Sequence, residues 1–347
     1  MRTAVGLSKR RGAWVAGFAV VVALLALAAC GGDGDGGSEV DGPTPAAPSE
    51  GPASGAARLC ASGFASDVTA TVASPELIEI SGLAASRRNE GVLWAHNDSG
   101  DTARVFAVGT AGEHLGAFSL AGAQAVDWED MALGPGPQEG IDYLYLGDIG
   151  DNGEQRSEIV VYRVPEPDVT SGGTPATSDR PGVETLTLRY PDRAHDAETL
   201  LVDPVDGDLL IVTKEVSGSN ALVFRAPPAL AAGSTTTLEQ VGAIDFRSLP
   251  ARPLPLSPPT FVAGLGHLPT GGDVSPEGDV VAIRTYSTVW LWERPEGAPL
   301  WEAFTSTPCE GPSAVEPQGE AVAFLADGSG YVTVSEGANP PIHRFGE

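Results

Sequence analysis

Five stretches of the chain repeat one order of events, and this repetition limits the possible folds more than any other feature. In each stretch, a short run that begins with a polar residue is followed by Gly, Pro or Asp turn residues and then by a second run rich in β-branched and aromatic residues. A third apolar run follows, and the pattern recurs at intervals of about 50–70 residues. The second runs are residues 92–95, 143–146, 209–212, 280–283 and 331–334. Units of three or four antiparallel strands at such spacing are typical of β-propeller blades.

We therefore predict an all-β fold, a five-bladed β-propeller, with six blades as the alternative count. A β-sandwich is the alternative fold, but it would not explain why five units share one internal order. The last unit runs out of chain just after its third strand, residues 342–345. Residues 67–72 form a strand-like run with no other partner, so we expect them to supply the missing outer strand and to close the ring.

The first thirty residues have the features of an export signal. A basic head with Arg2 and Lys9 precedes an apolar run, residues 13–29, which ends in the sequence LAAC at residues 27–30. This sequence resembles the lipobox of bacterial lipoprotein signal peptides, which implies cleavage before Cys30 and attachment of lipid, palmitate included, to that cysteine. An uncleaved membrane anchor is the alternative, although the run is short for a span of ~20 residues.

Three regions follow from this assignment. Residues 1–29 are the predicted signal peptide, residues 30–57 the lipidated cysteine with a Gly/Pro/Ser-rich flexible tether, and residues 58–347 the propeller domain. We expect a monomer, anchored by lipid on the extracytoplasmic side of the cell membrane. In that oxidising compartment Cys60 and Cys309, the two remaining cysteines, most simply form a disulfide.

The charge excludes nucleic acid as a partner. The whole chain has 20 basic and 46 acidic residues, and removal of the four basic residues of the signal leaves 16 against 46, a net charge of −30. Such a surface repels polyanions and anionic headgroups, so membrane attachment is expected to be covalent. An acidic surface also attracts divalent cations. The alternative is that these carboxylates lie on the surface only because water solvates them there.

The first strand of each unit is expected to line the centre of the propeller, so equivalent positions form a ring. By alignment on the turn that ends each first strand, this ring is Ser81, Glu129, Glu198, Thr270 and Glu320, with Asp273 as a competitor for the fourth position. Three converging carboxylates cannot all stay ionised without a partner, because desolvation and repulsion each cost several kcal/mol. The oxygen-only set suits calcium, whose flexible shell tolerates irregular geometry. The alternative is that the glutamates face water at strand ends.

Two resemblances can be stated at this point. A ring ordered Ser, Glu, Glu, Thr, Glu resembles that of the calcium-activated nucleotidase (apyrase) propellers, which implies that these five residues hold a central calcium. The motifs NDSGD at residues 97–101, DWEDMAL at 127–133 and DAETLLVDP at 196–204 are more similar to secreted bacterial propeller lipoproteins of the phytase-like and esterase-like type. This second resemblance covers roughly residues 77–345 and implies a propeller fold family whose reactions are not settled.

Polar residues at the ends of the second strands form a second predicted group, at one rim. We select Asp98, Asp148, Lys214, Arg284 and Glu336 as candidate catalytic residues. Lys214 is the only lysine that remains after cleavage, and with Arg284 it would bind an anionic group, while the carboxylates would hold metal or act as bases. Asx-rich turns are an equally good explanation of the Asp98 and Asp148 segments.

Several mechanisms are excluded by missing motifs. The chain has no G-x-S-x-G elbow, H-E-x-x-H helix, P-loop or dinucleotide fingerprint. The first hypothesis is therefore a calcium-dependent phosphoester hydrolase acting on an anionic small molecule at the rim. The second is a non-catalytic cell-surface binding propeller with a structural calcium. The third is a calcium-dependent lactonase or esterase, for which Lys214 and Arg284 would be less necessary.

Overall fold

The computed structural model describes residues 55–61, 67–169, 176–250, 252 and 265–346, all within the second of two compact units, Gly51–Glu347. The predicted signal peptide, Cys30 and most of the predicted tether lie outside the described residues. Among the residues that the structure does describe, no helix is long and apolar enough to cross a membrane.

Five sheets make up this unit, and each begins with an inner strand and continues outward as an antiparallel meander. Blade 1 contains β2 (Ile80–Ala85), β3 (Val92–Asn97), β4 (Arg104–Gly109), β5 (His114–Leu120) and β9 (Ala176–Arg180). Blade 2 contains β6 (Trp128–Pro135), β7 (Asp142–Asp148), β8 (Ile159–Pro165), β10 (Glu184–Arg189) and β14 (Thr235–Thr237). Blade 3 contains β11 (Ala197–Val202), β12 (Leu209–Thr213), β13 (Ala221–Ala226) and β15 (Glu239–Ile244). Blade 4 contains β16 (Pro269–Val274), β17 (Val280–Thr285), β18 (Val289–Glu293) and β19 (Cys309–Gly311), and blade 5 contains β20 (Gly319–Phe324), β21 (Gly330–Ser335), β22 (Pro341–Gly346) and β1 (Asp67–Thr71).

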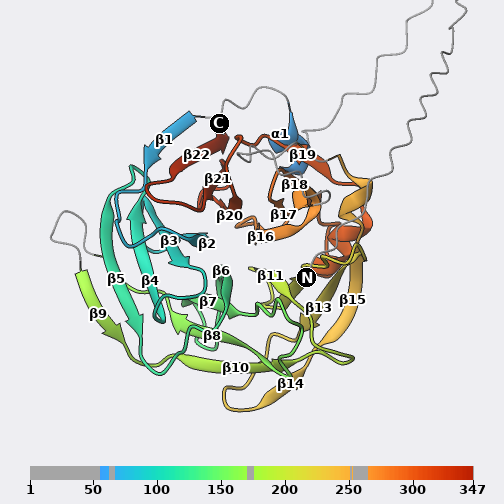
Figure 1. Ribbon diagram of the computed structural model, residues 1–347, viewed down its shortest axis with the longest axis horizontal. Helices are drawn as coiled ribbons and strands as arrows, with labels where there is room; N and C mark the ends of the chain where they lie inside the picture. The colour runs from blue at the N-terminus through green and yellow to red at the C-terminus, as the bar shows by residue number, and fades with distance from the viewer. Residues whose placement is uncertain (1–54, 62–66, 170–175, 251, 253–264, 347) are drawn as a thin grey trace, which may run out of the picture. The chain divides into compact units, whose positions relative to one another are not determined.

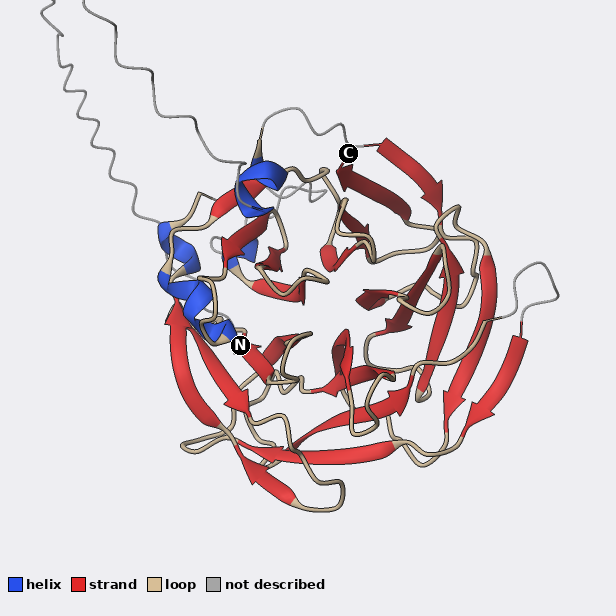
Figure 2. Cartoon of the chain, turned by 180° about the vertical axis from the view of Figure 1, so that it is seen from behind, coloured by secondary structure: helices blue, strands red, loops and turns tan. Residues whose placement is uncertain are grey.

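The inner strands form a closed circle. Each of β2, β6, β11, β16 and β20 packs against the next, and β20 packs against β2 (Figure 1). The prediction of a five-bladed, all-β propeller is confirmed, and the helical segments are short: α1 (Gly55–Cys60) and the 3₁₀ turns η1 (Phe246–Ser248), η2 (Leu265–His267) and η3 (Leu300–Thr305) (Figure 2).

The N-terminal strand closes the ring as the sequence predicts. β1 pairs antiparallel with β22 and becomes the outermost strand of blade 5, with Val68 opposite His343. A disulfide joins Cys60 at the end of α1 to Cys309 in β19, across 249 positions of sequence. The start of the domain is thus attached to blade 5 by strand pairing and to blade 4 by a covalent bond. A bridge across so long a loop restricts the unfolded chain strongly.

Two outer strands join the blade that precedes them, and neither pairing was predicted from the sequence. β9 pairs parallel with β5, and β14 pairs parallel with β10. In both cases a segment from the following unit adds an outer strand to the preceding blade. These strands are short and polar, with sequences ATSDR and TTT, so their apolar patterning does not indicate which blade they join.

The hydrophobic core lies between blades. Five clusters of buried side chains join blades 1 and 2, 2 and 3, 3 and 4, 4 and 5, and 5 and 1. Trp94, Trp128 and Trp292 are among the largest fully buried side chains. Each blade buries its two faces only against its neighbours, so the fold is stable only as a complete ring. Burial of apolar area between blades contributes roughly 25 cal/mol per Å² to the stability of the folded state.

Candidate functional site

The five predicted ring residues occupy equivalent positions. Each is the second residue of an inner strand: Ser81 in β2, Glu129 in β6, Glu198 in β11, Thr270 in β16 and Glu320 in β20. In all five blades the register between the inner strand and its partner skips this residue, which marks a β-bulge. A bulge turns a side chain away from the ordinary alternation of the sheet. We call this end of the inner strands the entrance.

The two hydroxyls of the ring bind main chain. Ser81 Oγ donates a hydrogen bond to the carbonyl oxygen of Glu129, from blade 1 to blade 2. Thr270 Oγ1 donates to the carbonyl oxygen of Gly319 at 2.9 Å and of Glu320 at 3.3 Å, from blade 4 to blade 5. Both side chains are buried, so their evident role is to connect neighbouring inner strands.

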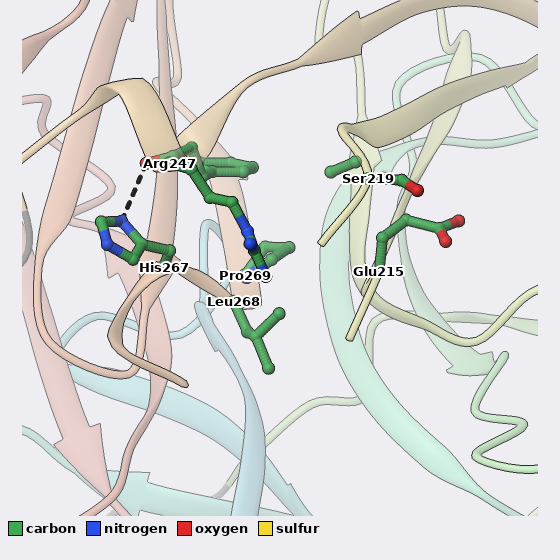
Figure 3. Close-up of a pocket in the computed structure, with 8 residues that line it drawn as sticks. Glu215, Ser219, Arg247, His267, Leu268 and Pro269 are labelled. Atoms are coloured by element: carbon green, nitrogen blue, oxygen red, sulfur yellow. Dashed lines mark hydrogen bonds between the residues drawn. The ribbon is translucent and has the colours of Figure 1, made fainter. Parts of the chain in front are cut away.

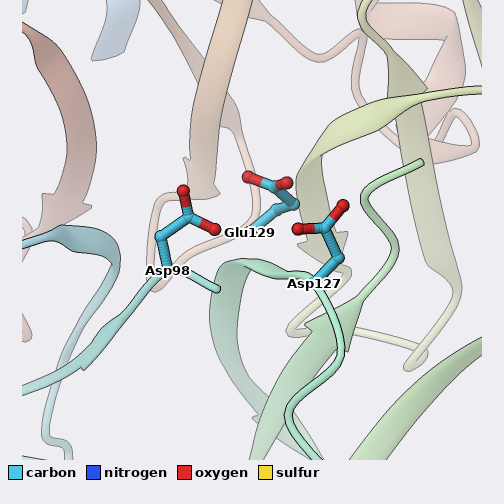
Figure 4. Close-up of side chains that lie close together, drawn as sticks. All are labelled: Asp98, Asp127 and Glu129. Carbon is cyan, nitrogen blue, oxygen red and sulfur yellow. The ribbon is translucent and has the colours of Figure 1, made fainter. Parts of the chain in front are cut away.

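A compact acidic group does form at the entrance, but with a different membership from the predicted ring. One carboxylate oxygen each from Asp98, Asp127 and Glu129 lies within 4.8 Å of the other two (Figure 4). It combines one predicted ring residue, one predicted rim residue and Asp127, which the sequence analysis did not select. Asp127 stands two residues before Glu129, and that spacing, which places side chains on one face of a strand, was the signal available in the sequence.

Gly150 makes room for this group. A Cβ atom at Gly150 would lie 2.2 Å from Glu129 Oε1 and 2.6 Å from Asp127 Oδ2. The absence of a side chain lets both carboxylates approach the main chain of the loop after β7. The Gly150 N–H donates to the Asp127 carbonyl at 3.2 Å, which holds this loop in place.

More carboxylates surround the group. Those at the entrance, which we call the entrance carboxylates, are Asp98, Asp127, Glu129, Glu198, Glu320 and Glu336. Burial raises the pKa of Glu129 well above its ordinary value, and Glu198, Asp98 and Asp127 raise it further. Burial likewise raises the pKa of Asp127 to about 6, with a further contribution from Asp98. For Glu336, burial and then Asp98 and Glu79 raise the pKa to about 7.

One ammonium group compensates part of this charge. Lys214, which follows β12, forms an ion pair with Glu198 Oε1 and donates a hydrogen bond to Tyr286 Oη at 3.0 Å. Burial lowers the pKa of Lys214, but the Glu198 carboxylate and Tyr286 outweigh it and place the pKa above its ordinary value. The second oxygen of Glu198 is buried and has no hydrogen-bond partner. Tyr286 lies in the turn after β17 of another blade, so no sequence pattern predicts its contact with Lys214.

Two of the predicted rim residues are engaged in the scaffold. Arg284 is 2% exposed, forms an ion pair with Glu316 and donates to the carbonyl oxygen of Ala321 at 3.1 Å. A buried guanidinium needs such partners because its desolvation is costly. Asp148 is 1% exposed, pairs with Arg156 at 2.8 Å and accepts the main-chain N–H of Asp127 at 3.2 Å. Neither residue presents a free charge at the rim.

Two further aspartates, which we call the backbone-bonded aspartates, were not selected from the sequence as ring members. Asp130 accepts main-chain hydrogen bonds from Met131 at 2.9 Å, Leu200 at 2.9 Å and Gly272 at 3.0 Å, on three different inner strands. Asp273, the predicted competitor of Thr270, accepts the N–H groups of Val274 at 2.8 Å and Phe324 at 2.7 Å. Their carboxylates connect blades, as the ring hydroxyls do.

A crevice between blades 3 and 4 is too small for a ligand. Its volume is about 10 Å³, enough for about one water molecule, and Figure 3 shows Glu215 and Ser219 on one side with Arg247 and His267 on the other. His267 Nδ1 lies 2.9 Å from the carbonyl oxygen of Phe246, so this ring is held by the main chain.

The donor set at the entrance fits a hard divalent cation. Asp98, Asp127 and Glu129 offer oxygen atoms only, which suits calcium better than zinc. Among the described residues no group donates a hydrogen bond to the Glu129 carboxylate, although Glu129 is only 4% exposed. A largely buried carboxylate to which no protein group donates is satisfied by water, by a proton or by a cation.

The fold defines the class of this chain as a five-bladed β-propeller. No family model and no curated protein matches the sequence. Among solved structures, a gluconolactonase of Xanthomonas campestris is similar to the chain, with 14% identity over 78% of this chain and 77% of that one and a TM-score of 0.41. A likeness at that level carries no argument about activity.

Proposed function

We propose that the chain is a calcium-dependent hydrolase of carboxylic esters or lactones, with Asp98, Asp127 and Glu129 as the metal-binding residues. The observation that carries the proposal is the convergence of these three carboxylates within 4.8 Å, with Glu129 buried and without a hydrogen-bond donor. When bound, the ion would supply Lewis-acid polarisation of a carbonyl oxygen.

The chain's own residues support this chemistry in separate ways. Gly150 leaves space for the carboxylates of Asp127 and Glu129. Glu336, whose pKa is raised to about 7 mainly by burial, is suited to accept a proton from water near neutral pH. The other acidic side chains and the net charge of −26 favour neutral substrates over polyanions.

The positive side chains favour an ester over a phosphoester substrate. A phosphoester hydrolase was expected to bind its substrate through Lys214 and Arg284. In the structure Arg284 is buried against Glu316, and Lys214 is paired with Glu198. The charges of both groups are thus already offset by carboxylates and cannot neutralise a phosphate dianion, although Lys214 keeps one N–H that can donate a hydrogen bond. The ester or lactone hypothesis is therefore the better supported one.

Calcium binding and turnover test the proposal together. Purified full-length protein is titrated with calcium by calorimetry and assayed, with and without a chelator, on p-nitrophenyl acetate, γ-butyrolactone and bis(p-nitrophenyl) phosphate. We expect calcium-dependent hydrolysis of the first two and none of the third. Because Glu129 would contact the ion directly, Glu129→Gln should weaken calcium binding about 100-fold or more.

The matched control is Glu79→Gln, which removes an exposed carboxylate of the same rim without touching the three ligands. It should change calcium affinity less than about threefold. Calcium-dependent hydrolysis of the phosphodiester alone would restore the phosphoester hypothesis. Calcium binding without turnover of any substrate would favour the non-catalytic binding propeller.

A further inference from the structure

Tyr286 reaches across a blade boundary to the entrance. It follows β17 in blade 4, while its hydroxyl oxygen accepts a hydrogen bond from Lys214, which follows β12 in blade 3, at 3.0 Å. The Lys214 ammonium also lies 5.2 Å from the centre of the Tyr286 ring. Two side chains from different blades therefore hold each other in place beside the entrance carboxylates.

This pair retains unused hydrogen-bond donors. An ammonium has three N–H donors, and Lys214 uses one for Glu198 and one for Tyr286. Tyr286 Oη acts as an acceptor, so its own O–H remains to be donated, and it makes no such bond within the described part of the chain. The pair thus offers one O–H and one N–H.

These two donors lie among side chains that are mostly hydrogen-bond acceptors. Glu198 and Glu320 lie near enough to Tyr286 to help burial raise its pKa, so the phenol keeps its proton at neutral pH. The side chains grouped here are otherwise mostly acceptors, the entrance carboxylates. A substrate carbonyl that is attacked by water develops negative charge on its oxygen, and that oxygen requires donors rather than acceptors.

We infer that Tyr286 and Lys214 form the hydrogen-bond donor pair for the carbonyl oxygen of the ester substrate, and the inference rests on the proposed function. As the oxygen of water bonds to the carbonyl carbon, the π electrons of the C=O bond move to the carbonyl oxygen, and a proton of the water passes to a carboxylate. Tyr286 O–H and the free Lys214 N–H donate to the resulting oxyanion and keep their own protons. The C=O bond then reforms as the bond to the alcohol oxygen breaks, and the protonated carboxylate returns the proton taken from water to that oxygen, so the alcohol leaves neutral and the carboxylate is regenerated.

Tyr286→Phe is the direct test because it removes one donor and keeps the ring against Lys214. We expect kcat to fall about 100-fold on both p-nitrophenyl acetate and γ-butyrolactone, with KM and calcium affinity nearly unchanged. An equal loss is expected because both substrates form the oxyanion, whatever their leaving group. The matched control is Tyr190→Phe, which removes a buried hydroxyl that has no hydrogen-bond partner and should leave kcat unchanged.

Each other result is informative. A loss confined to γ-butyrolactone, whose leaving group is poor, would assign Tyr286 to the leaving alcohol and overturn the inference. A parallel loss of calcium affinity would show a structural role and would overturn it too. If kcat is unchanged in Tyr286→Phe, the inference is overturned but the proposed function stands. If the wild-type protein hydrolyses no ester, the proposed function is overturned and the inference with it.

Discussion

The entrance carboxylates and the backbone-bonded aspartates are the same kind of group in the same five inner strands, yet their surroundings differ. Asp130 accepts three main-chain hydrogen bonds and Asp273 accepts two. Glu129, next to Asp130 in sequence, accepts none from the described residues and faces Asp98 and Asp127 instead. Neighbouring positions of one strand thus carry a structural carboxylate and a candidate ligand.

The difference follows from the bulge at each entrance position. Glu129 is the residue that the β6–β7 register skips, whereas Asp130 is paired with Gly147. The side chain of Asp130 accepts hydrogen bonds from main-chain N–H groups of its own and two other inner strands. Among the skipped residues, Ser81 and Thr270 donate to main-chain carbonyls, whereas the Glu129 carboxylate accepts no main-chain hydrogen bond from the described residues, so it is the one suited to bind a cation.

The largest effect is expected for Asp130→Ala. The substitution leaves the N–H groups of Met131, Leu200 and Gly272 without their acceptor. At about 1–3 kcal/mol for each of the three unsatisfied groups, the free energy of unfolding should fall by about 3–9 kcal/mol. Denaturant unfolding measures this loss, and Glu296→Ala, at an exposed position, is the control with a change below about 0.5 kcal/mol.

The same variant also separates the two groups of carboxylates. If Asp130 is purely structural, calcium affinity of the folded Asp130→Ala protein stays within about threefold of the wild type. A loss as large as that of Glu129→Gln would show that the two carboxylates act as one site.

A smaller effect is expected from the pH dependence contributed by Asp273. Burial raises the pKa of Asp273 to about 7, above its unfolded value of 3.8, despite two main-chain donors. The folded state therefore holds more protons between these values, and its stability falls as pH rises from about 4 to 7. Between pH 5.5 and 7.5 the full contribution would be about 2 kcal/mol, and solvent screening of the partly exposed side chain reduces it to about 1 kcal/mol.

Unfolding of wild type and Asp273→Asn across that range measures this contribution as the difference between their pH slopes. The difference should be the same with and without calcium, because Asp273 is not a ligand in our proposal. A difference that disappears when calcium is added would place Asp273 in the metal site.

The smallest expected effect is that of Gly150→Ala. The new Cβ would overlap Glu129 Oε1 and Asp127 Oδ2 and push both carboxylates apart, so calcium affinity should fall about tenfold. Gly153→Ala, in the same loop, meets only the flexible side chain of Gln155 at 3.4 Å and serves as the control in the same calorimetric titration. Equal effects of the two substitutions would argue against a built site beside Gly150.

The architecture was largely predictable, for a physical reason. Each blade needs the same alternation of turns and apolar runs, so five degenerate copies reinforce one another even where a single copy is weak. The closing strand was predictable because blade 5 lacked an outer partner. The parallel pairings of β9 and β14 with the preceding blade were not, because short polar strands at an outer edge bury little and leave little pattern in the sequence.

The site was predictable only in part. Glu129, Asp98 and Lys214 were selected because each occupies a repeated position at a strand end. Asp127 was not, although its spacing from Glu129 was a signal in the sequence, and Tyr286 was not, because its partner Lys214 lies on another blade. Arg284 shared the strand-end pattern of Lys214, but it packs against Glu316 from blade 5 rather than facing solvent.

The sequence by itself determined the repeat, the blade order, the closing strand and the five equivalent inner positions, because these depend on local periodicity and on the need of each sheet to bury its faces. Only the tertiary structure decided which carboxylates meet. The closure of the ring brings Asp98 of blade 1 to Glu129 of blade 2, and Tyr286 of blade 4 to Lys214 of blade 3. Such contacts depend on distances between blades, which no local pattern encodes.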